Sequence, residues 1–147
     1  MNAARDQIVE QRVRLVSIYA TPNSYQTLYD LLMERTKVQS ISHKQMPTMQ
    51  EHIKFVVGHP YEAWYLIHTA GQAHPVGAAY LTKQREIGIF IFRHHQGQGY
   101  GAAALKALRI AHPGPMLANI APANEPSLAF FKKHGAVLIQ HTFQLPP

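Results

Sequence analysis

Cysteine is absent from this sequence, and its absence removes several kinds of chemistry at once. Disulfide bridges, thiol nucleophiles and metal sites built on cysteine are all excluded. Long apolar runs are absent too, since no stretch approaches the roughly 20 residues that a membrane-spanning helix needs. Residues 1–10 mix charged with polar side chains and lack the apolar core of a secretory signal. We therefore expect a cytoplasmic protein that does not associate with a membrane.

Acidic residues are scarce. Eight Asp and Glu stand against 14 Lys and Arg, and the formal net charge is +6. Such a balance favours an anionic partner, whether a nucleic acid, a phosphate-bearing cofactor or an anionic substrate. The basic residues are scattered rather than gathered in a block, so charge alone gives no reason to predict a nucleic-acid partner. A nucleic-acid-binding protein therefore remains a hypothesis that only the net charge supports.

Hydrophobic residues, by contrast, are plentiful, at 46% of the chain against 15% for charged residues. This is the composition of a globular protein rather than of a disordered chain. The length of 147 residues suits one domain, and the sequence contains no repeat, low-complexity tract or linker. We predict a single domain that covers residues 1–147.

Hydrophobic periodicity predicts alternating strands and helices. The predicted strands cover residues 12–19, 62–69, 76–82, 86–92, 116–120 and 137–145. The predicted helices begin after Thr21-Pro22-Asn23 and at Pro47-Thr48, and two more cover residues 100–111 and 124–134. The order β-α-α-β-β-β-α-β-α-β predicts an α/β protein, in which helices cover both faces of a mixed sheet.

A glycine-rich loop connects the predicted strand 86–92 to the helix that follows it. Glycines at 97, 99 and 101 let the backbone adopt positive φ and approach a ligand closely. The helix start adds unsatisfied N–H groups and the positive end of the helix dipole. Together these features predict a pocket for phosphate or pyrophosphate, although a glycine-rich turn without a ligand would show the same pattern.

Two common phosphate-binding loops do not fit this segment. A Walker loop ends in Gly-Lys-Ser/Thr, whereas this loop ends in Tyr100-Gly101-Ala102. The dinucleotide fingerprint matches superficially from Gly97 to Ala102. That fold, however, places the motif after its first strand and continues with several βα units, whereas less than a third of this chain follows Ala102.

Two motifs in the second half of the chain occur together. Residues 96–101 read Gln-Gly-Gln-Gly-Tyr-Gly and match the pattern Gln/Arg-x-x-Gly-x-Gly/Ala, and residues 124–135 form an Asn-led helix that ends in glycine. Both motifs, their separation and the predicted strand order resemble the GNAT superfamily of N-acetyltransferases. The resemblance covers the chain from about Arg12 to its end. It implies transfer of an acetyl group from acetyl-CoA to a primary amine of a small molecule, by direct attack.

The resemblance also assigns the residues that contact the cofactor. Backbone groups of three strand residues would contact pantetheine and the acetyl carbonyl, and a strand amide near Ile91 would stabilise negative charge on the carbonyl oxygen. The loop would hold the pyrophosphate through its amides, and Asn124 would hydrogen-bond pantetheine. The strand residues are Ile89, Phe90 and Ile91, and the loop residues are Gln96, Gly97, Gln98, Gly99, Tyr100, Gly101 and Ala102. From the residues alone, the strand also suits a plain core position, and Asn124 suits a helix N-cap.

Glu86 is the candidate catalytic base. It begins the predicted strand, at or within one residue of the position where several family members place a catalytic or substrate-binding carboxylate. An alkyl amine with a pKa of about 10 is almost fully protonated at neutral pH, so a base or a water relay assists its attack. Neighbouring side chains on a strand face opposite ways, so an exposed strand-end glutamate is the other interpretation.

Two positions depart from the family pattern. Phe131, at the cofactor, stands where many members carry a tyrosine that protonates the departing thiolate. A thiolate with a pKa of about 8.5 is a fair leaving group unaided. Asn119 stands where members that acetylate protein amines have a glutamate, which weakens an assignment to protein acetylation. These departures keep a second hypothesis open: a non-catalytic acyl-CoA-binding module or sensor.

The acceptor is predicted from short segments. Residues 41–43, 52–55 and 86–91 look similar to N-acetyltransferases of bacterial amino-sugar pathways, which implies a nucleotide-linked amino sugar. Its cleft would lie between the first two helices and the sheet, with His43, His52 and Glu86 as candidate contacts. Both histidines also suit ordinary helix-surface positions. A polyamine is disfavoured, because eight acidic residues are few for holding a polycation.

Histidine is abundant, with ten residues, which raises the question of a metal. His94 and His95 are adjacent, so we expect their side chains to point apart, and no His-x-x-x-His pair on a helix accompanies them. We predict no metal site. The last predicted strand is short for the family's C-terminal hairpin, so completion by a strand of a second chain is one route to a homodimer.

Overall fold

A five-stranded sheet in the order β1-β2-β3-β4-β5 organises the structure, which is a computed structural model that describes residues 12–35 and 45–147. The first four strands form an antiparallel meander, and the fifth pairs in parallel with β4. The strands are β1 (Arg14–Ser17), β2 (Ala63–His68), β3 (Gly77–Leu81), β4 (Glu86–Ile91) and β5 (Leu117–Ala118). The mixed sheet confirms the predicted fold class.

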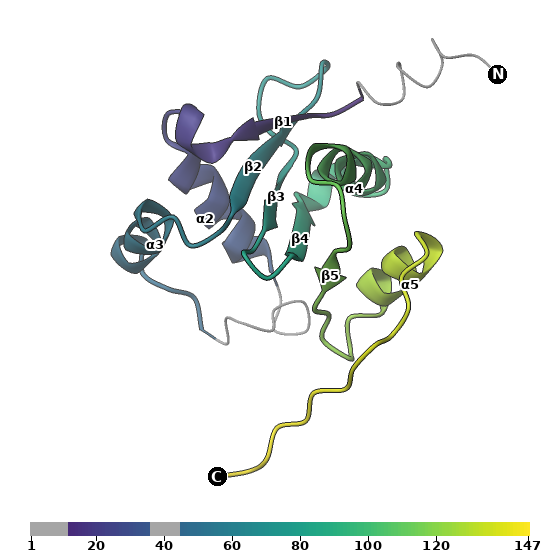
Figure 1. The fold of residues 1–147 in the computed structure, drawn as a ribbon. Helices are drawn as coiled ribbons and strands as arrows, with labels where there is room; N and C mark the ends of the chain where they lie inside the picture. The colour runs from purple at the N-terminus through teal and green to yellow at the C-terminus, as the bar shows by residue number, and fades with distance from the viewer. Residues whose placement is uncertain (1–11, 36–44) are drawn as a thin grey trace, which may run out of the picture.

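Helices lie on both faces of this sheet, as the periodicity predicts (Figure 1). Figure 1 shows α2 and α3 on one side and α4 on the other, with α5 beside β5. The α-helices of the described residues are α2 (Ser24–Glu34), α3 (Met49–Val57), α4 (Tyr100–Ala111) and α5 (Glu125–Lys133). Two 3-10 turns, η1 (Ile18–Ala20) and η2 (Arg93–His95), follow β1 and β4.

The two-residue period of the strands divides the core into two layers. On β2, Leu66 packs with the α2–α3 layer, whereas its neighbour Ile67 packs with the α4 layer. On β3, Ala78 and Ala79 divide in the same way. Successive side chains of a strand point to opposite faces, so β2 and β3 each contribute to both layers and are buried on both sides.

A capping box begins α3 where the sequence predicts a helix start. The Thr48 hydroxyl accepts from the Glu51 N–H at 3.2 Å, and the Glu51 carboxylate accepts from the Thr48 N–H at 3.0 Å. The hydrogen bond from the Thr48 backbone, followed by the Thr48 side chain, lowers the pKa of the Glu51 carboxyl, because it favours the charged form. None of the helices among the described residues has both the length and the apolarity that crossing a membrane would require.

The predicted strand at 137–145 is wrong. These residues follow α5 in extended form, outside the sheet, and run away from it in Figure 1. Their apolar side chains stay exposed, Phe143 at 83% and Val137 at 79%. Alternation predicts a strand only where a partner edge exists, and β5, which the sequence predicts over 116–120, pairs over just two residues. The N-terminal strand is likewise shorter than predicted, because the chain turns into η1 at Ile18.

Gly77 marks a close approach of β3 to β4. A Cβ on Gly77 would lie 2.1 Å from the carbonyl oxygen of Phe90 and 3.0 Å from the Cα of Ile91. Backbone atoms cannot rotate away from such a contact, so we expect Gly77→Ala to lower the free energy of unfolding by about 1–3 kcal/mol. Urea denaturation measures this loss. Gly71→Ala is the control, since a Cβ there meets nothing within 4 Å, and an equal loss at both positions would contradict the prediction.

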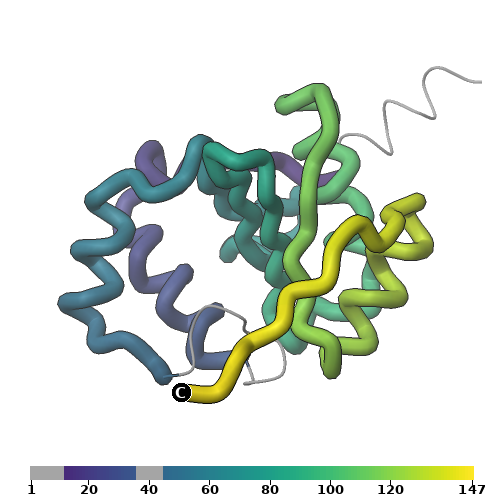
Figure 2. Tube along the Cα trace, turned by 60° about the horizontal axis from the view of Figure 1, so that its bottom comes forward, coloured from purple at the N-terminus to yellow at the C-terminus, as the bar shows by residue number. Residues whose placement is uncertain are grey.

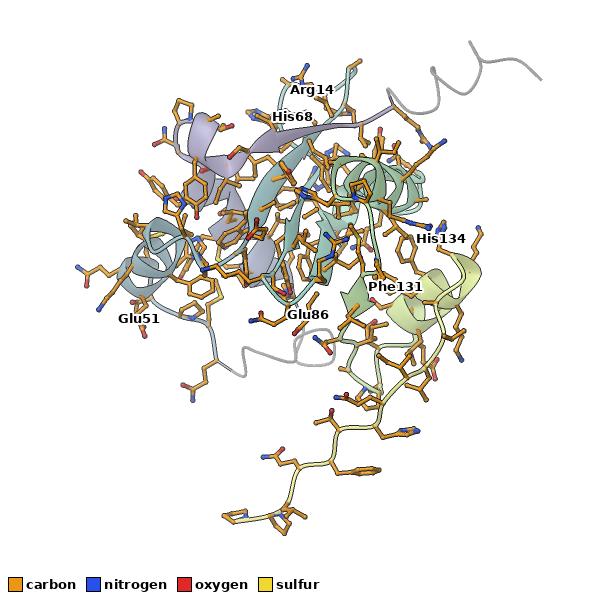
Figure 3. All side chains as sticks on the ribbon, in the orientation of Figure 1. Arg14, Glu51, His68, Glu86, Phe131 and His134 are labelled. Carbon is orange, nitrogen blue, oxygen red and sulfur yellow. The ribbon has the colours of Figure 1, made fainter. Side chains whose placement is uncertain are left out.

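His68 links stability to pH. It pairs with Arg14 across β1 and β2 (Figure 3), and burial, followed by the Arg14 charge, lowers its pKa. The unfolded chain therefore binds more protons, so this contribution to stability is present above about pH 6.5 and is lost as the pH falls through the folded-state pKa. We expect His68→Gln to reduce the fall in Tm between about pH 7.5 and pH 5. His74 is exposed, so His74→Gln is the control. If the Tm of His68→Gln falls as far as that of wild type over this pH range, the assignment to His68 is refuted.

Candidate active site

The parallel pair β4–β5 opens along its length. Only Glu86↔Leu117 and Ile87↔Ala118 are paired, so the rest of β4 extends beyond the end of β5. On the other side of β4, hydrogen bonds from Thr82 N to Glu86 O at 2.8 Å and from Phe92 N to Val76 O at 2.9 Å fix the ladder. Because an antiparallel ladder alternates, every second residue of β4 directs its N–H and C=O away from β3.

This alternation sorts the strand residues predicted to bind a cofactor. Ile89 and Ile91 direct their backbone groups toward the open β5 side, and their side chains pack toward α4. Phe90 directs its backbone toward β3 and its ring toward the α2–α3 layer. Ile89 and Ile91 therefore present backbone groups to the open side of β4, whereas Phe90 does not.

The glycine-rich loop leads from this open edge into α4. The Gln96 side chain donates to the Ile91 carbonyl oxygen at 3.0 Å, which ties the loop to the end of β4. Gly97 and Gly99 adopt φ of 77° and 82°, the left-handed region that favours glycine. Ala103 N donates to Gly99 O at 3.1 Å and is the first donor of the helix ladder. The N–H groups of residues 100–102 are left without an intrahelical acceptor, as an anion site requires.

Arg12 also lies at this loop. Its guanidinium donates to the Gln98 carbonyl oxygen and lies 5.3 Å from the centre of the Tyr100 ring. A Cβ on Gly99 would lie 2.6 Å from Arg12 Nη1. A positive charge therefore stands beside the free amides of α4. The sequence motif does not include Arg12, so it could not predict this contact. Arg12 precedes β1, and the packing of α4 against β1 brings it to the loop.

Glu86 and Asn119 meet across the paired end of β4 and β5. The Asn119 amide donates to the Glu86 carboxylate, and the Thr82 hydroxyl accepts from the Glu86 N–H at 3.0 Å. Figure 3 shows Glu86 at the lower end of the sheet, with its side chain outside the packed core. The β-strand period places Glu86 on the same face of β4 as Phe90, which is the face toward α2 and α3.

Arg85 fixes the position of residues 112–117, the segment that leads through β5 to Asn119. Its guanidinium donates to the carbonyl oxygens of His112, Pro113 and Pro115 at 2.9, 3.1 and 3.0 Å. The Arg85 carbonyl oxygen in turn accepts from Leu117 N at 2.8 Å. The start of β5 is therefore fixed by the residue next to Glu86.

The two residues of the second motif have structural roles. Asn124 is buried and caps α5, where its side-chain oxygen accepts from Ser127 N at 3.3 Å. Phe131 packs against the buried cluster of Leu81, Ile87 and Leu105. Its ring, labelled in Figure 3, lies on the side of α5 that faces the sheet. The geometry thus supports the capping interpretation of Asn124 and adds a core contact for Phe131.

A cavity of about 400 Å³ lies between α2, α3 and the sheet, where the sequence predicts the substrate cleft. Five of its fifteen lining residues are Phe, Tyr or Trp. The rings that line it belong to Phe55, Tyr61, Trp64, Tyr80 and Phe90. The sequence gave no reason to group them, because they come from α3, the segment before β2, and three strands.

Glu86, one of the predicted substrate contacts, is not among the residues that line this cavity. His52 lines it but is 3% exposed, and its Nε2 donates to the Tyr25 carbonyl oxygen at 2.9 Å, so it is no surface residue. His43 lies outside the described residues. The expectation that His94 and His95 point apart is wrong: their ring centres are 4.0 Å apart, because they lie in a 3-10 turn rather than a strand. Within the described residues, no three His, Asp or Glu are grouped to hold a metal.

Comparisons with known proteins agree with this geometry. A search of curated proteins found no matching sequence. A domain from Methanocaldococcus jannaschii is similar in structure, with TM-score 0.66 and 20% identity over 84% of this chain and 86% of that one. A chimera of the Vibrio cholerae spermidine N-acetyltransferase SpeG and hSSAT gives TM-score 0.64 and 15% identity over 88% and 83%. An aminoglycoside acetyltransferase in complex with coenzyme A gives 0.53 and 16% over 84% and 82%.

At these identities, the structural neighbours establish the fold alone. The sequence comparison goes further, because the model of the acetyltransferase (GNAT) family matches residues 25–136, which include β2 to β5, the glycine-rich loop and, apart from Ser24, the α-helices of the described residues. The protein therefore belongs to the acetyltransferase (GNAT) family and is an N-acetyltransferase.

Proposed function

We propose that the protein transfers an acetyl group from acetyl-CoA to the primary amine of a small molecule bound in the aromatic cavity. The observation that carries this proposal is the position of β4. Its open backbone edge leads into the glycine-rich loop on one side, and its Phe90 and Glu86 side chains face the α2–α3 layer on the other. Acetyl-CoA bound along the open edge and an amine bound in the cavity would thus meet at β4.

The residues present suit acetyl-CoA. The free amides at the start of α4, with Arg12 beside them, would hold the diphosphate. The outward-facing backbone groups of Ile89 and the Ile91 N–H would bind the amide groups of pantetheine as a neighbouring strand does, whereas the Ile91 carbonyl oxygen already accepts from Gln96. When bound, acetyl-CoA supplies the thioester that a neutral amine attacks.

Glu86 is the proposed proton acceptor. An amine with a pKa of about 10 must lose a proton before it can attack at neutral pH. Glu86 lies on the same face of β4 as the cavity-lining Phe90, outside the cavity lining itself, and its charge contributes to the raised pKa of Tyr80, whose main cause is burial. Asn119 holds the carboxylate in place. Phe131 has no proton to give, so we propose that the thiolate leaves unaided or is protonated by water.

For the acceptor we propose a nucleotide-linked amino sugar. An aromatic wall suits the planar base of a nucleotide, and a basic protein suits its phosphates. Of the cavity's lining residues one is acidic, Glu51, and its carboxylate caps α3. The cavity therefore offers little to a polycation.

The test is thiol release from acetyl-CoA across a panel of amines, which includes nucleotide-linked and free amino sugars, polyamines, amino acids and peptides. The protein contains no cysteine, so it is silent toward the thiol reagent. We expect turnover with the amino-sugar members. Acetyl-CoA binding without turnover would favour the non-catalytic acyl-CoA-binding module instead. Absence of acetyl-CoA binding would refute the proposal entirely.

A further inference from the structure

The aromatic cavity contains a positive charge that the proposed chemistry does not use. Arg35 directly follows α2 and lines the cavity together with Tyr61, Tyr80 and Phe90. Its guanidinium carbon lies 4.1 Å from the centre of the Phe90 ring. The side chain therefore lies on the cavity face of β4, the strand that carries Glu86.

This charge is incompletely satisfied. Arg35 Nε is buried and has no hydrogen-bond partner among the described residues 12–35 and 45–147, which is costly for a charged group. Burial lowers the pKa of Arg35, and the opposing influences are Tyr80 and Tyr61 rather than a carboxylate. An arginine nevertheless stays protonated in a protein. A cation thus lies at the cavity wall with a donor left over.

Two carboxylates that Arg35 could pair with are engaged elsewhere: Glu34 precedes it in the chain, and Glu51 lines the same cavity. Glu34 accepts from the Arg93 N–H at 2.7 Å, which ties α2 to the segment after β4. Glu51 accepts from the Thr48 N–H at 3.0 Å and caps α3. Both carboxylates therefore have hydrogen-bond partners of their own, so within residues 12–35 and 45–147 the Arg35 charge is open to a ligand.

The surrounding rings stay neutral and form a stacking surface. Tyr61 and Tyr80 stack at 4.3 Å with an interplanar angle of 11°, and Trp64 lies 4.7 Å from Tyr61. Burial raises the pKa of Tyr61 to about 12, so its hydroxyl carries no negative charge at neutral pH. Gly88 makes room for this arrangement, because a Cβ there would lie 2.3 Å from the Tyr80 ring. These rings form an uncharged aromatic surface beside the Arg35 cation, in which Trp64 is inclined by 67° to Tyr61.

We propose that Arg35 binds an anionic group of the acceptor, and that the acceptor is an amine whose ring packs on this aromatic wall. The planar guanidinium forms paired hydrogen bonds with either a phosphate or a carboxylate, so both remain chemically suitable. Arg35 determines which acceptor amine binds and takes no part in the acetyl transfer itself. This inference rests on the proposed acetyl transfer, whose acceptor it specifies.

The test compares amines that differ by one anionic group. Glucosamine 6-phosphate against glucosamine examines the phosphate, tyrosine against tyramine examines the carboxylate, and UDP-glucosamine examines the nucleotide-linked form. Trp64 is the single tryptophan of the chain and lines the cavity, so its fluorescence reports binding even without turnover. We expect the anionic member of at least one pair to bind wild type about 10- to 100-fold more tightly.

Variants then assign this preference to Arg35. We expect Arg35→Gln to abolish the preference for the anionic member, with affinity for the other member and for acetyl-CoA unchanged. Arg35→Lys keeps the charge without the planar fork and should retain part of the preference. Arg109→Gln removes a charge of the same type from an exposed position on α4 and should change nothing.

The outcomes separate this inference from the proposed function. Equal affinity of wild type for both members of every pair would overturn the role of Arg35, even if an amine is acetylated. The same conclusion follows if Arg35→Gln folds, as its thermal unfolding shows, and keeps the preference. Failure of all amines to turn over, with the anion preference intact, would refute acetyl transfer but leave the anion site standing.

Discussion

Gly99→Val is expected to lower the affinity for acetyl-CoA by about 100-fold or more. Gly99 adopts φ of 82°, and a Cβ there would lie 2.6 Å from Arg12 Nη1. A branched side chain would displace Arg12 and disturb the backbone that presents the amides of residues 100–102. Loss of two such charge-assisted hydrogen bonds, at about 1.5 kcal/mol each, accounts for the expected factor. Isothermal titration with acetyl-CoA measures the change.

Gly135→Val is the matched control for this variant. Gly135 has φ of 89° and follows His134, the C-cap of α5, with nothing within 4 Å of its Cβ position. Both variants carry the same backbone strain, of about 1–2 kcal/mol, and should lose similar stability. Only Gly99→Val should lose acetyl-CoA. Equal affinities in the two variants would show that the loop does not bind the cofactor.

Glu86→Gln is expected to lower kcat/KM for the acceptor by about 10²–10⁴-fold, the usual contribution of a general base. The amide keeps the shape of the side chain but cannot accept the ammonium proton. Affinity for acetyl-CoA should stay unchanged, because Glu86 lies at the paired end of β4 rather than at the loop. Steady-state kinetics of thiol release, with the best acceptor from the panel, measure the effect.

Glu62→Gln controls for the change of charge. Glu62 is an exposed carboxylate just before β2, and its removal alters the net charge by the same amount. We expect its kinetics to match those of wild type. If Glu86→Gln loses less than tenfold, Glu86 is a strand-end residue without a role in proton transfer, and a water relay or another group takes the proton.

Features that depend on neighbours in the sequence could be predicted from it. Residues a few positions apart determine three of these features: the start of α3 at Thr48 and Glu51, the glycine-rich loop, and the order of strands and helices along the chain. Hydrogen bonds and dihedral preferences of this kind act locally, so a short stretch of sequence contains their causes. The predicted strand at 137–145 failed because its alternation is local, whereas a strand requires a partner edge elsewhere in the chain.

The sequence by itself determined the mixed α/β fold, the family motif and the candidacy of Glu86. Tertiary structure alone decided which groups meet: Arg12 with the loop, Asn119 with Glu86, and Arg35 with the aromatic wall. It also decided that His52 is buried and that Ile89 and Ile91, not Phe90, turn their backbone to the open edge. The physical reason is that side-chain contacts and backbone orientation depend on strand register and helix packing, which join residues far apart in the chain.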